Sequence, residues 1–200
     1  MEVVGDRSRT RAIRVGATLT AIALTAVGAA VSRAHTPADI VQVELAGSPD
    51  VLQQRVVGDR TDAAAVANIQ RYLDSLPYDR YLFIPAYVVG LGLVLWVGKT
   101  VLPRRWLRGL SHLLAYGTVL AGLLDLLEDH GLGVALGQLI EHPQGTSGVS
   151  AAWLSVARVS ATVKFALLVP AVIVGVGAAV DGLVRLGRSP GSGAVVSPDA

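Results

Sequence analysis

The sequence predicts an all-α fold: a transmembrane four-helix bundle with a small helical cap, outside the membrane, between the first and second spans. Three observations support it. Hydrophobic residues make up 52% of the chain and charged residues only 16%, with a mean hydropathy of +0.54, whereas soluble domains are about 25% charged. The apolar residues gather into four blocks, each long enough to cross roughly 30 Å of hydrocarbon as a helix. The alternating strands of a membrane barrel are absent from the sequence.

The chain alternates between apolar blocks and polar connections. In order, we predict a basic cytoplasmic N-terminus (1–14), transmembrane helix 1 (15–32), an extracytoplasmic cap (33–80), transmembrane helix 2 (81–101), a cytoplasmic loop (102–109), transmembrane helix 3 (110–129), an extracytoplasmic loop (130–150), transmembrane helix 4 (151–184) and a disordered cytoplasmic tail (185–200). The tail is small, polar and turn-rich, a composition that buries too little apolar surface to fold.

The first apolar block has two interpretations. It follows Arg7, Arg9, Arg11 and Arg14, which suit the cytoplasmic end of a membrane anchor. A basic stretch, an apolar run and small residues near Ser32 also describe a secretory signal peptide. The uncharged run is longer than the roughly 7–15 apolar residues of a signal peptide, so we favour a retained anchor and keep cleavage as the alternative.

The polar stretch that follows is predicted to form short amphipathic helices on the membrane surface. Residues 48–50 read Ser-Pro-Asp, a helix start with a capping side chain and a proline in the first turn, and Gly58 is typical of a helix end. Residues 41–45 alternate apolar and polar, so a short extended piece competes with a helix there. From Asp62 the apolar spacing is helical as far as Pro77, which breaks or kinks the helix.

Basic residues in the short connections predict the orientation. The connection between the second and third spans carries Lys99, Arg104, Arg105 and Arg108, whereas residues 126–153 contain no Lys or Arg. Because Lys and Arg concentrate in short cytoplasmic loops, we predict a multi-pass protein with both termini in the cytoplasm.

Several charges fall within the apolar blocks and need partners. Counted from Leu110, the helical rise places Asp125 about 22 Å and Glu128 about 27 Å along the third span. Counted back from Val184, Lys164 lies about 30 Å along the fourth span. Because an unpaired charge in a bilayer is costly, we predict ion pairs between Lys164 and both carboxylates.

Other polar side chains are expected near the same depth. Asp129, one turn beyond Asp125, is expected to lie already in water, and Ser160 offers a hydroxyl. The cluster either fixes the register between helices or forms a pocket, open to the outside, for a headgroup, an ion or a small solute. A third alternative is that the charged side chains snorkel to the interface without forming a shared site, and the sequence leaves all three open. The predicted ligand-binding or ion-pair cluster comprises Asp79, Tyr87, Asp125, Glu128, Arg158 and Lys164.

Four stretches carry a family resemblance: VELAGSPD in the cap, YDRYLFIPAYVVGL at the second span, AGLLDLLEDHGL in the third and ARVSATVKFALL in the fourth. Over roughly residues 38–180 the chain resembles an uncharacterised group of small bacterial four-span membrane proteins, common in actinobacteria, whose third-span motif reads D-x-x-E-N. The resemblance implies a shared architecture in the bacterial cytoplasmic (inner) membrane and no activity. Matching positions are Asp79, Tyr87, Asp125, Glu128 and Lys164, while Asp129 replaces the usual Asn.

Missing motifs argue against most chemistry. The chain has no Cys, no phosphate-binding loop, no dinucleotide fingerprint, no serine-hydrolase elbow and no H-E-x-x-H motif. The acidic and histidine residues of the outer loop match no recognised ligand spacing, so no metal and no cofactor are predicted. With a net charge of +2 and basic residues placed beside the spans, nucleic acid is not an expected partner. These acidic and histidine residues are Glu128, Asp129, His130, Glu141 and His142.

The sequence therefore favours a structural or accessory membrane protein. It would act within the lipid bilayer, with a second copy of itself or with another membrane protein, and its charged cluster near the outer face would order the bundle and bind a polar ligand. The alternatives are a small transporter or channel subunit for an ion, a proton or a small solute, and a membrane enzyme acting on lipid headgroups. The lack of a catalytic constellation weighs against an enzyme.

Overall fold

The computed structural model describes residues 3–102 and 104–187, and side chains within residues 19–184 except at 101, 103, 182 and 183. The regular elements of this part of the chain are all helices, so the all-α prediction is confirmed. Residues 188–200 of the expected tail lie outside the described residues. The elements are α1 (Val3–His35), α2 (Ile40–Glu44), α3 (Pro49–Val56), α4 (Asp62–Tyr78), η1 (Asp79–Phe83), α5 (Ile84–Val101), α6 (Arg105–Glu141) and α7 (Ala151–Gly187).

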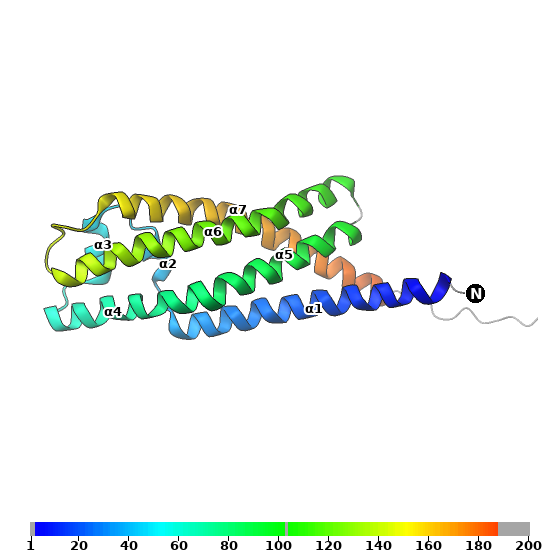
Figure 1. Cartoon of the computed structure of the whole chain (residues 1–200), viewed down its shortest axis with the longest axis horizontal. Coiled ribbons are helices and arrows are strands. Elements are labelled where there is room, and N and C mark those ends of the chain that lie inside the picture. The colour runs from blue at the N-terminus through cyan, green and yellow to red at the C-terminus, as the bar shows by residue number, and fades with distance from the viewer. Residues whose placement is uncertain (1–2, 103, 188–200) are drawn as a thin grey trace, which may run out of the picture.

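The long helices lie side by side along one axis (Figure 1). α4, η1 and α5 form one unbroken rod, α1 packs along α5, and α6 packs against both α5 and α7. Within the described part of the chain, three helices are long and apolar enough to cross a membrane: Asp62–Thr100, Arg105–Glu141 and Ala151–Asp181. The apolar part of α1 with described side chains, Leu19–His35, is shorter.

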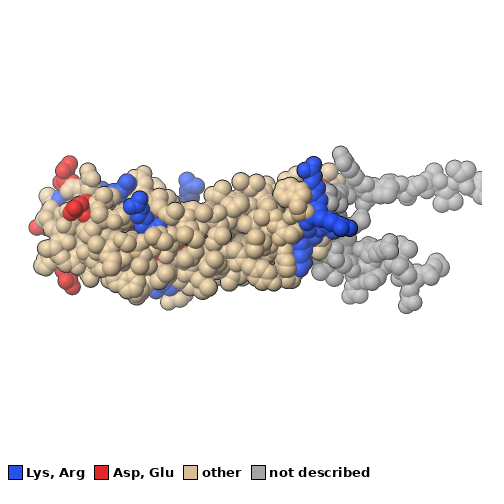
Figure 2. Space-filling model, turned by 90° about the horizontal axis from the view of Figure 1, so that it is seen from above, with Lys and Arg blue, Asp and Glu red and all other residues tan. Residues whose placement is uncertain are grey.

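Charged side chains are unevenly distributed along this axis. Figure 2 shows a band of Lys and Arg near one end, next to it a stretch almost free of charged side chains, and towards the other end acidic side chains together with several basic ones. Apolar side chains are exposed along the middle, including Leu113 and Leu123 of α6 and Ile173 and Val176 of α7. An exposed apolar belt between two polar ends suits contact with lipid. The surface is therefore compatible with a membrane location.

Glycines let α1 and α5 approach closely. A Cβ atom on Gly28 would clash with the Cβ of Ala86. A Cβ atom on Gly90 would clash with the hydroxyl of Thr25 and would lie 2.7 Å from the carbonyl oxygen of Ala21. Lipid tails provide no hydrophobic drive for helices to associate, so this close backbone packing is what holds such helices together in a membrane.

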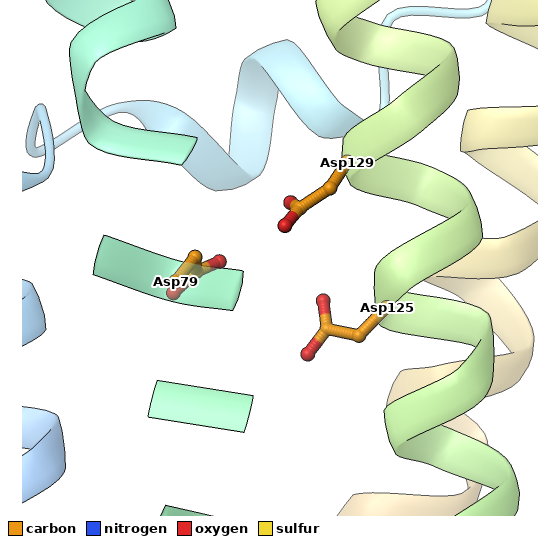
Figure 3. A group of neighbouring side chains, drawn as sticks. All are labelled: Asp79, Asp125 and Asp129. Carbon is orange, nitrogen blue, oxygen red and sulfur yellow. The ribbon is translucent and has the colours of Figure 1, made fainter. Parts of the chain in front are cut away.

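A π-helical turn joins α4 to α5. In this turn the N–H of Ile84 donates to the carbonyl oxygen of Asp79. Pro77 stays inside α4, so the break or kink predicted at this proline takes the form of a widened turn in a continuous helix. A π turn inserts one extra residue into an α-helix and shifts the direction of the side chains beside it. Here it holds Asp79 opposite α6, as Figure 3 shows.

Residues 36–61, which we call the α2–α3 segment, build an apolar core with the ends of α4 and α6. Val43 and Leu52 are fully buried in one cluster with Ile69 of α4 and Leu136 of α6. The segment therefore covers the ends of two long helices, which is a firmer attachment than the surface-lying helices expected from the sequence. The alternating residues 41–45 belong mostly to α2 and are not extended.

The capping pattern of α3 agrees with its sequence. The Ser48 side chain accepts a hydrogen bond from the N–H of Val51 at 3.4 Å, and Pro49 occupies the first turn. Gly58 follows the helix with a φ of +55°, a left-handed conformation that suits glycine.

α6 is longer than the apolar block that predicts it. It runs from Arg105 to Glu141, past both ends of the expected span at 110–129, and the connection to α7 shrinks to residues 142–150. The part of α6 beyond residue 129 packs against the α2–α3 segment and α4. Asp129 consequently lies inside a helix that continues for three more turns.

Candidate functional site

A buried ion-pair cluster lies between α2, α6 and α7, with Lys164 at its centre. The Nζ atom of Lys164 lies 2.7 Å from Oδ1 of Asp125, 2.8 Å from Oε2 of Glu128 and 3.8 Å from Oε2 of Glu44. The exposed fractions are 4% for Lys164, 1% for Asp125 and 1% for Glu128. One ammonium group thus contacts carboxylates from two other elements in a site closed to solvent.

Helical spacing and small neighbours bring these groups together. Asp125 and Glu128 are three residues apart on α6, so they share one face of the helix, and that face packs against α7. Near the cluster a Cβ atom on Gly131 would lie 2.9 Å from the carbonyl oxygen of Trp153, and Ala157 of α7 is buried beside it. The two backbones therefore approach closely enough for the Lys164 side chain to reach both carboxylates.

Hydroxyl groups from other helices complete the hydrogen bonds. The Tyr87 hydroxyl of α5 donates to Oδ2 of Asp125 at 3.0 Å. On the opposite side, the Ser32 hydroxyl of α1 donates to Oδ1 of Asp79 at 3.1 Å. Hydrogen bonds to ionised carboxylates are stronger than those between neutral groups. The polar region thus connects every long helix of the described chain.

Glu44 joins the cluster from outside the long helices, and the sequence prediction did not include it. It is the last residue of α2 and is buried. Burial raises the pKa of the Glu44 carboxyl, while the Lys164 ammonium acts in the opposite direction. Little in the sequence indicates that Glu44 joins the cluster. It is a single acidic residue between Val43 and Leu45, and it shares a helix face with Ile40 only if residues 40–44 form a helix.

Asp129 is buried, which corrects the expectation that it lies in water. Its exposed fraction is 3%. Its Oδ2 atom has no hydrogen-bond partner among the described residues. Figure 3 shows the carboxylates of Asp79, Asp125 and Asp129 facing a common space between η1 and α6. One oxygen from each of the three lies within 4.8 Å of the others.

The charges of this region do not balance. Its carboxyl groups outnumber the single ammonium of Lys164, and within the described chain the ion pairs of the region all involve that ammonium. Oδ2 of Asp129 lacks a hydrogen-bond partner there. Isolated buried carboxylates cost several kcal/mol each, so protons or a bound cation must offset the excess. The carboxyl groups are Glu44, Asp79, Asp125, Glu128 and Asp129.

Arg158 and Ser160 do not join the ion pairs. The exposed Arg158 side chain lies over Gly47, where a Cβ would clash with its Nη1 atom. It lines an open pocket of about 320 Å³ together with Gly47, Ser155 and Thr162. Ser160 is buried on the Lys164 side of α7, as expected for a residue one turn away. Of the six residues predicted for the cluster, Arg158 is the one that the structure places elsewhere.

The histidine and acidic residues that the sequence analysis assigned to the outer loop do not gather. His130 is exposed, and its ring meets the Trp153 ring edge-on with centroids 5.0 Å apart. Glu141 and His142 are exposed as well. The sequence predicts no metal site, and the carboxylates that the structure brings together are a different set, Asp79, Asp125 and Asp129.

Comparison with protein-family models, with curated proteins and with solved structures finds no match to this chain.

Proposed function

We propose that this protein is a multi-pass protein of the bacterial cytoplasmic membrane, a four-helix bundle with both termini in the cytoplasm and the α2–α3 segment outside. The three long apolar helices support the membrane location. The band of Lys and Arg near one end in Figure 2 supports the orientation, because basic residues favour the cytoplasmic side. In this orientation α1 is a retained first span.

Its proposed function is structural or accessory: it presents an ordered outer surface to the bilayer, to a second copy or to another membrane protein. The observation that carries this proposal is the position of Lys164. Its ammonium contacts Asp125 and Glu128 of α6 and reaches Glu44 of α2. A single side chain of α7 therefore fastens the α2–α3 segment to the bundle, and we call this arrangement the Lys164 clasp.

A small transporter or channel subunit is the alternative with some support, since the buried acidic excess suits a cation. An apolar layer next to the cluster is evidence against a transporter or channel. Leu95, Leu114, Ala115 and Ala171 form an apolar core between the cluster and the basic end. The buried hydroxyl of Ser111 in this layer donates to a backbone carbonyl oxygen. A path through one copy of the chain would have to open this apolar layer.

A membrane enzyme acting on headgroups is supported least. Asp125 and Glu128 are each only 1% exposed, so a substrate would have to displace the α2–α3 segment to reach them. A catalytic acid or base must come within hydrogen-bond distance of the group it serves.

The orientation can be tested with single cysteines because the chain has no Cys of its own. Ser147→Cys lies on the exposed α6–α7 connection and Thr100→Cys at the exposed end of α5. A membrane-impermeant maleimide added to intact cells is expected to label Ser147→Cys only, and Thr100→Cys only after permeabilisation. Labelling with the sides exchanged would refute the orientation, and equal labelling of both in intact cells would refute the spanning arrangement.

The clasp can be tested by proteolysis from outside the cell. Arg55, Arg60 and Arg71 are exposed on the α2–α3 segment and α4, and trypsin cleaves there only if the local structure opens. We expect slow cleavage in the wild type and much faster cleavage in Lys164→Met. The control is Lys99→Met, which removes the other Lys of the chain. Equal cleavage rates in all three proteins would refute the clasp.

A further inference from the structure

We propose that Asp79, Asp125 and Asp129 bind a divalent cation of the oxygen-preferring class, such as Ca²⁺ or Mg²⁺, between η1 and α6. The inference deepens the proposed function, because it names the polar ligand that the cluster would take. It uses a different part of the cluster from the Lys164 clasp, with only Asp125 shared between the two.

The geometry of the three carboxylates fits such an ion. One oxygen from each lies within 4.8 Å of the other two. Calcium binds oxygen at 2.3–2.6 Å, so two ligands on opposite sides of the ion lie about 4.6–5.2 Å apart. For magnesium, bound at 2.0–2.1 Å, the same separation is about 4.0–4.2 Å. Three carboxylate oxygens this close together can therefore share one divalent cation, and this limit is met by calcium and by magnesium alike.

Asp129 provides the independent reason to expect a ligand. It is 97% buried, since its exposed fraction is 3%, and Oδ2 has no hydrogen-bond partner among the described residues. Its carboxylate points into the space that it shares with Asp79 and Asp125 (Figure 3). Lys164 compensates Asp125 and Glu128 but forms no ion pair with Asp129. A buried carboxylate aimed at two others is costly, and a divalent cation among the three removes that cost.

The donor types select the class of metal. All three groups offer carboxylate oxygen, and the chain has no Cys. The nearest histidine in sequence, His130, is exposed and packs on Trp153. Oxygen-only sites favour calcium, magnesium or manganese over zinc and copper, which prefer nitrogen and sulfur.

Asp79 is the most exposed of the three residues: it is half-buried, whereas Asp125 and Asp129 are buried. An ion would therefore enter on the η1 side. The π turn keeps Asp79 opposite the two carboxylates of α6. A bound ion would connect the α4–α5 rod to α6, just as Lys164 connects α7 to α6.

The experiment measures calcium binding and thermal stability of the full chain purified in detergent. ⁴⁵Ca²⁺ equilibrium dialysis is expected to show one site per chain. Addition of Ca²⁺ to the chelator-treated protein should raise Tm by about 5 °C or more at a hundredfold excess over Kd. Mg²⁺ tested in the same way compares the two ions, and Na⁺ at equal ionic strength should give no rise.

The decisive variant is Asp129→Asn, compared with Asp59→Asn on the exposed surface of the α2–α3 segment. Asp129→Asn should weaken Ca²⁺ binding at least tenfold, yet its Tm without Ca²⁺ should equal or exceed that of the wild type, because a buried charge is gone. Asp59→Asn should bind as the wild type does. If Asp129→Asn does not fold, Asp79→Asn at the half-buried edge of the site provides the same comparison.

Two outcomes would overturn the proposal: a wild type that binds no Ca²⁺ in dialysis, or Asp129→Asn and Asp79→Asn variants that bind it with unchanged affinity. Either outcome leaves the Lys164 clasp standing, and the carboxylates would then be neutralised by protons. A third outcome is that the protein binds Ca²⁺ but trypsin cleaves Lys164→Met no faster than the wild type. That outcome would refute the clasp and support the cation site.

Discussion

Replacing Lys164 with Met removes the positive charge of the cluster while keeping a long, unbranched side chain. The lost ammonium lies 2.7 Å from Asp125 and 2.8 Å from Glu128. At an effective dielectric constant of 20, each contact corresponds to about 6 kcal/mol of Coulomb attraction. The carboxylates avoid losing all of this by taking up protons. Neutralising a carboxyl group with an ordinary pKa of about 4 at pH 7 costs about 4 kcal/mol.

Protonation is therefore the cheaper response, and it limits the loss of unfolding free energy to about 4 kcal/mol for each of the two stranded carboxylates. A loss of about 4 kcal/mol lies within the roughly 3–5 kcal/mol known for breaking a buried pair from one side, and we expect at least this loss in Lys164→Met. For a chain of this size it corresponds to a fall in Tm of about 10 °C.

The assay is thermal unfolding in detergent at pH 7, followed by circular dichroism, with Lys99→Met as the matched control. Lys99 lies over the Trp96 ring at 3.3 Å, a cation–π contact near the surface worth about 0.5–1 kcal/mol. Its replacement should lower Tm by only a few degrees. The Lys164→Met, Asp125→Asn double variant should recover part of the loss, because one of the stranded carboxylates is gone. A Lys164→Met protein that melts within 2 °C of Lys99→Met (a threshold of about 0.5–1 kcal/mol) would refute this reasoning.

Two further predictions concern the surroundings of the cluster. Tyr87→Phe removes the hydroxyl that donates to Asp125 at 3.0 Å, and we expect a loss of about 1.5–3 kcal/mol, measured as a lower Tm; an unchanged Tm would mean that this bond contributes nothing. Gly131→Ala places a Cβ 2.9 Å from the carbonyl oxygen of Trp153 and should cost about 1–3 kcal/mol by forcing α6 and α7 apart. Gly137→Ala, where a Cβ meets nothing within 4 Å, should instead stabilise α6 by about 0.5–1 kcal/mol; the same sign of Tm change in both glycine variants would contradict the close contact at Gly131.

The central ion pairs could be predicted from the sequence because they depend on helix geometry alone. Counting residues from the ends of the third and fourth apolar blocks places Asp125, Glu128 and Lys164 at similar heights. When opposite charges lie at the same height in adjacent helices, pairing with each other is the main way to avoid an unpaired charge in the membrane. The structure places these three side chains within hydrogen-bonding distance.

The position of Arg158 could have been predicted more closely from the same geometry. It precedes Lys164 by six residues, and at 100° per residue the two side chains point about 120° apart. Arg158 and Lys164 lie within two turns of each other along α7, but they are on different faces of the helix. The structure accordingly places Arg158 on the outer side of α7, over Gly47 of the α2–α3 segment.

Glu44 and Asp129 depend on packing that residue counting does not reveal. Asp129 is expected in water only if the third span ends near it, whereas α6 continues to Glu141 under the α2–α3 segment. The same segment carries Glu44 into the cluster. Its fold depends on apolar contacts such as Leu52 with Leu136, which are far apart in the sequence. A pattern read in short windows contains no information on such contacts.

For the membrane arrangement proposed above, the pairing of α6 with α7 also has a consequence for the order in which the helices would insert. Asp125 leaves the ribosome 39 residues before Lys164, its partner. On its own, α6 would carry Asp125 and Glu128 into the hydrocarbon without a cation, at a cost of up to about 2.5–3.5 kcal/mol for each charge near the centre. The connection between the two helices is short, at residues 142–150. The hairpin of α6 and α7, rather than either helix, is therefore the unit whose insertion is favourable, and synthesis of α7 completes it.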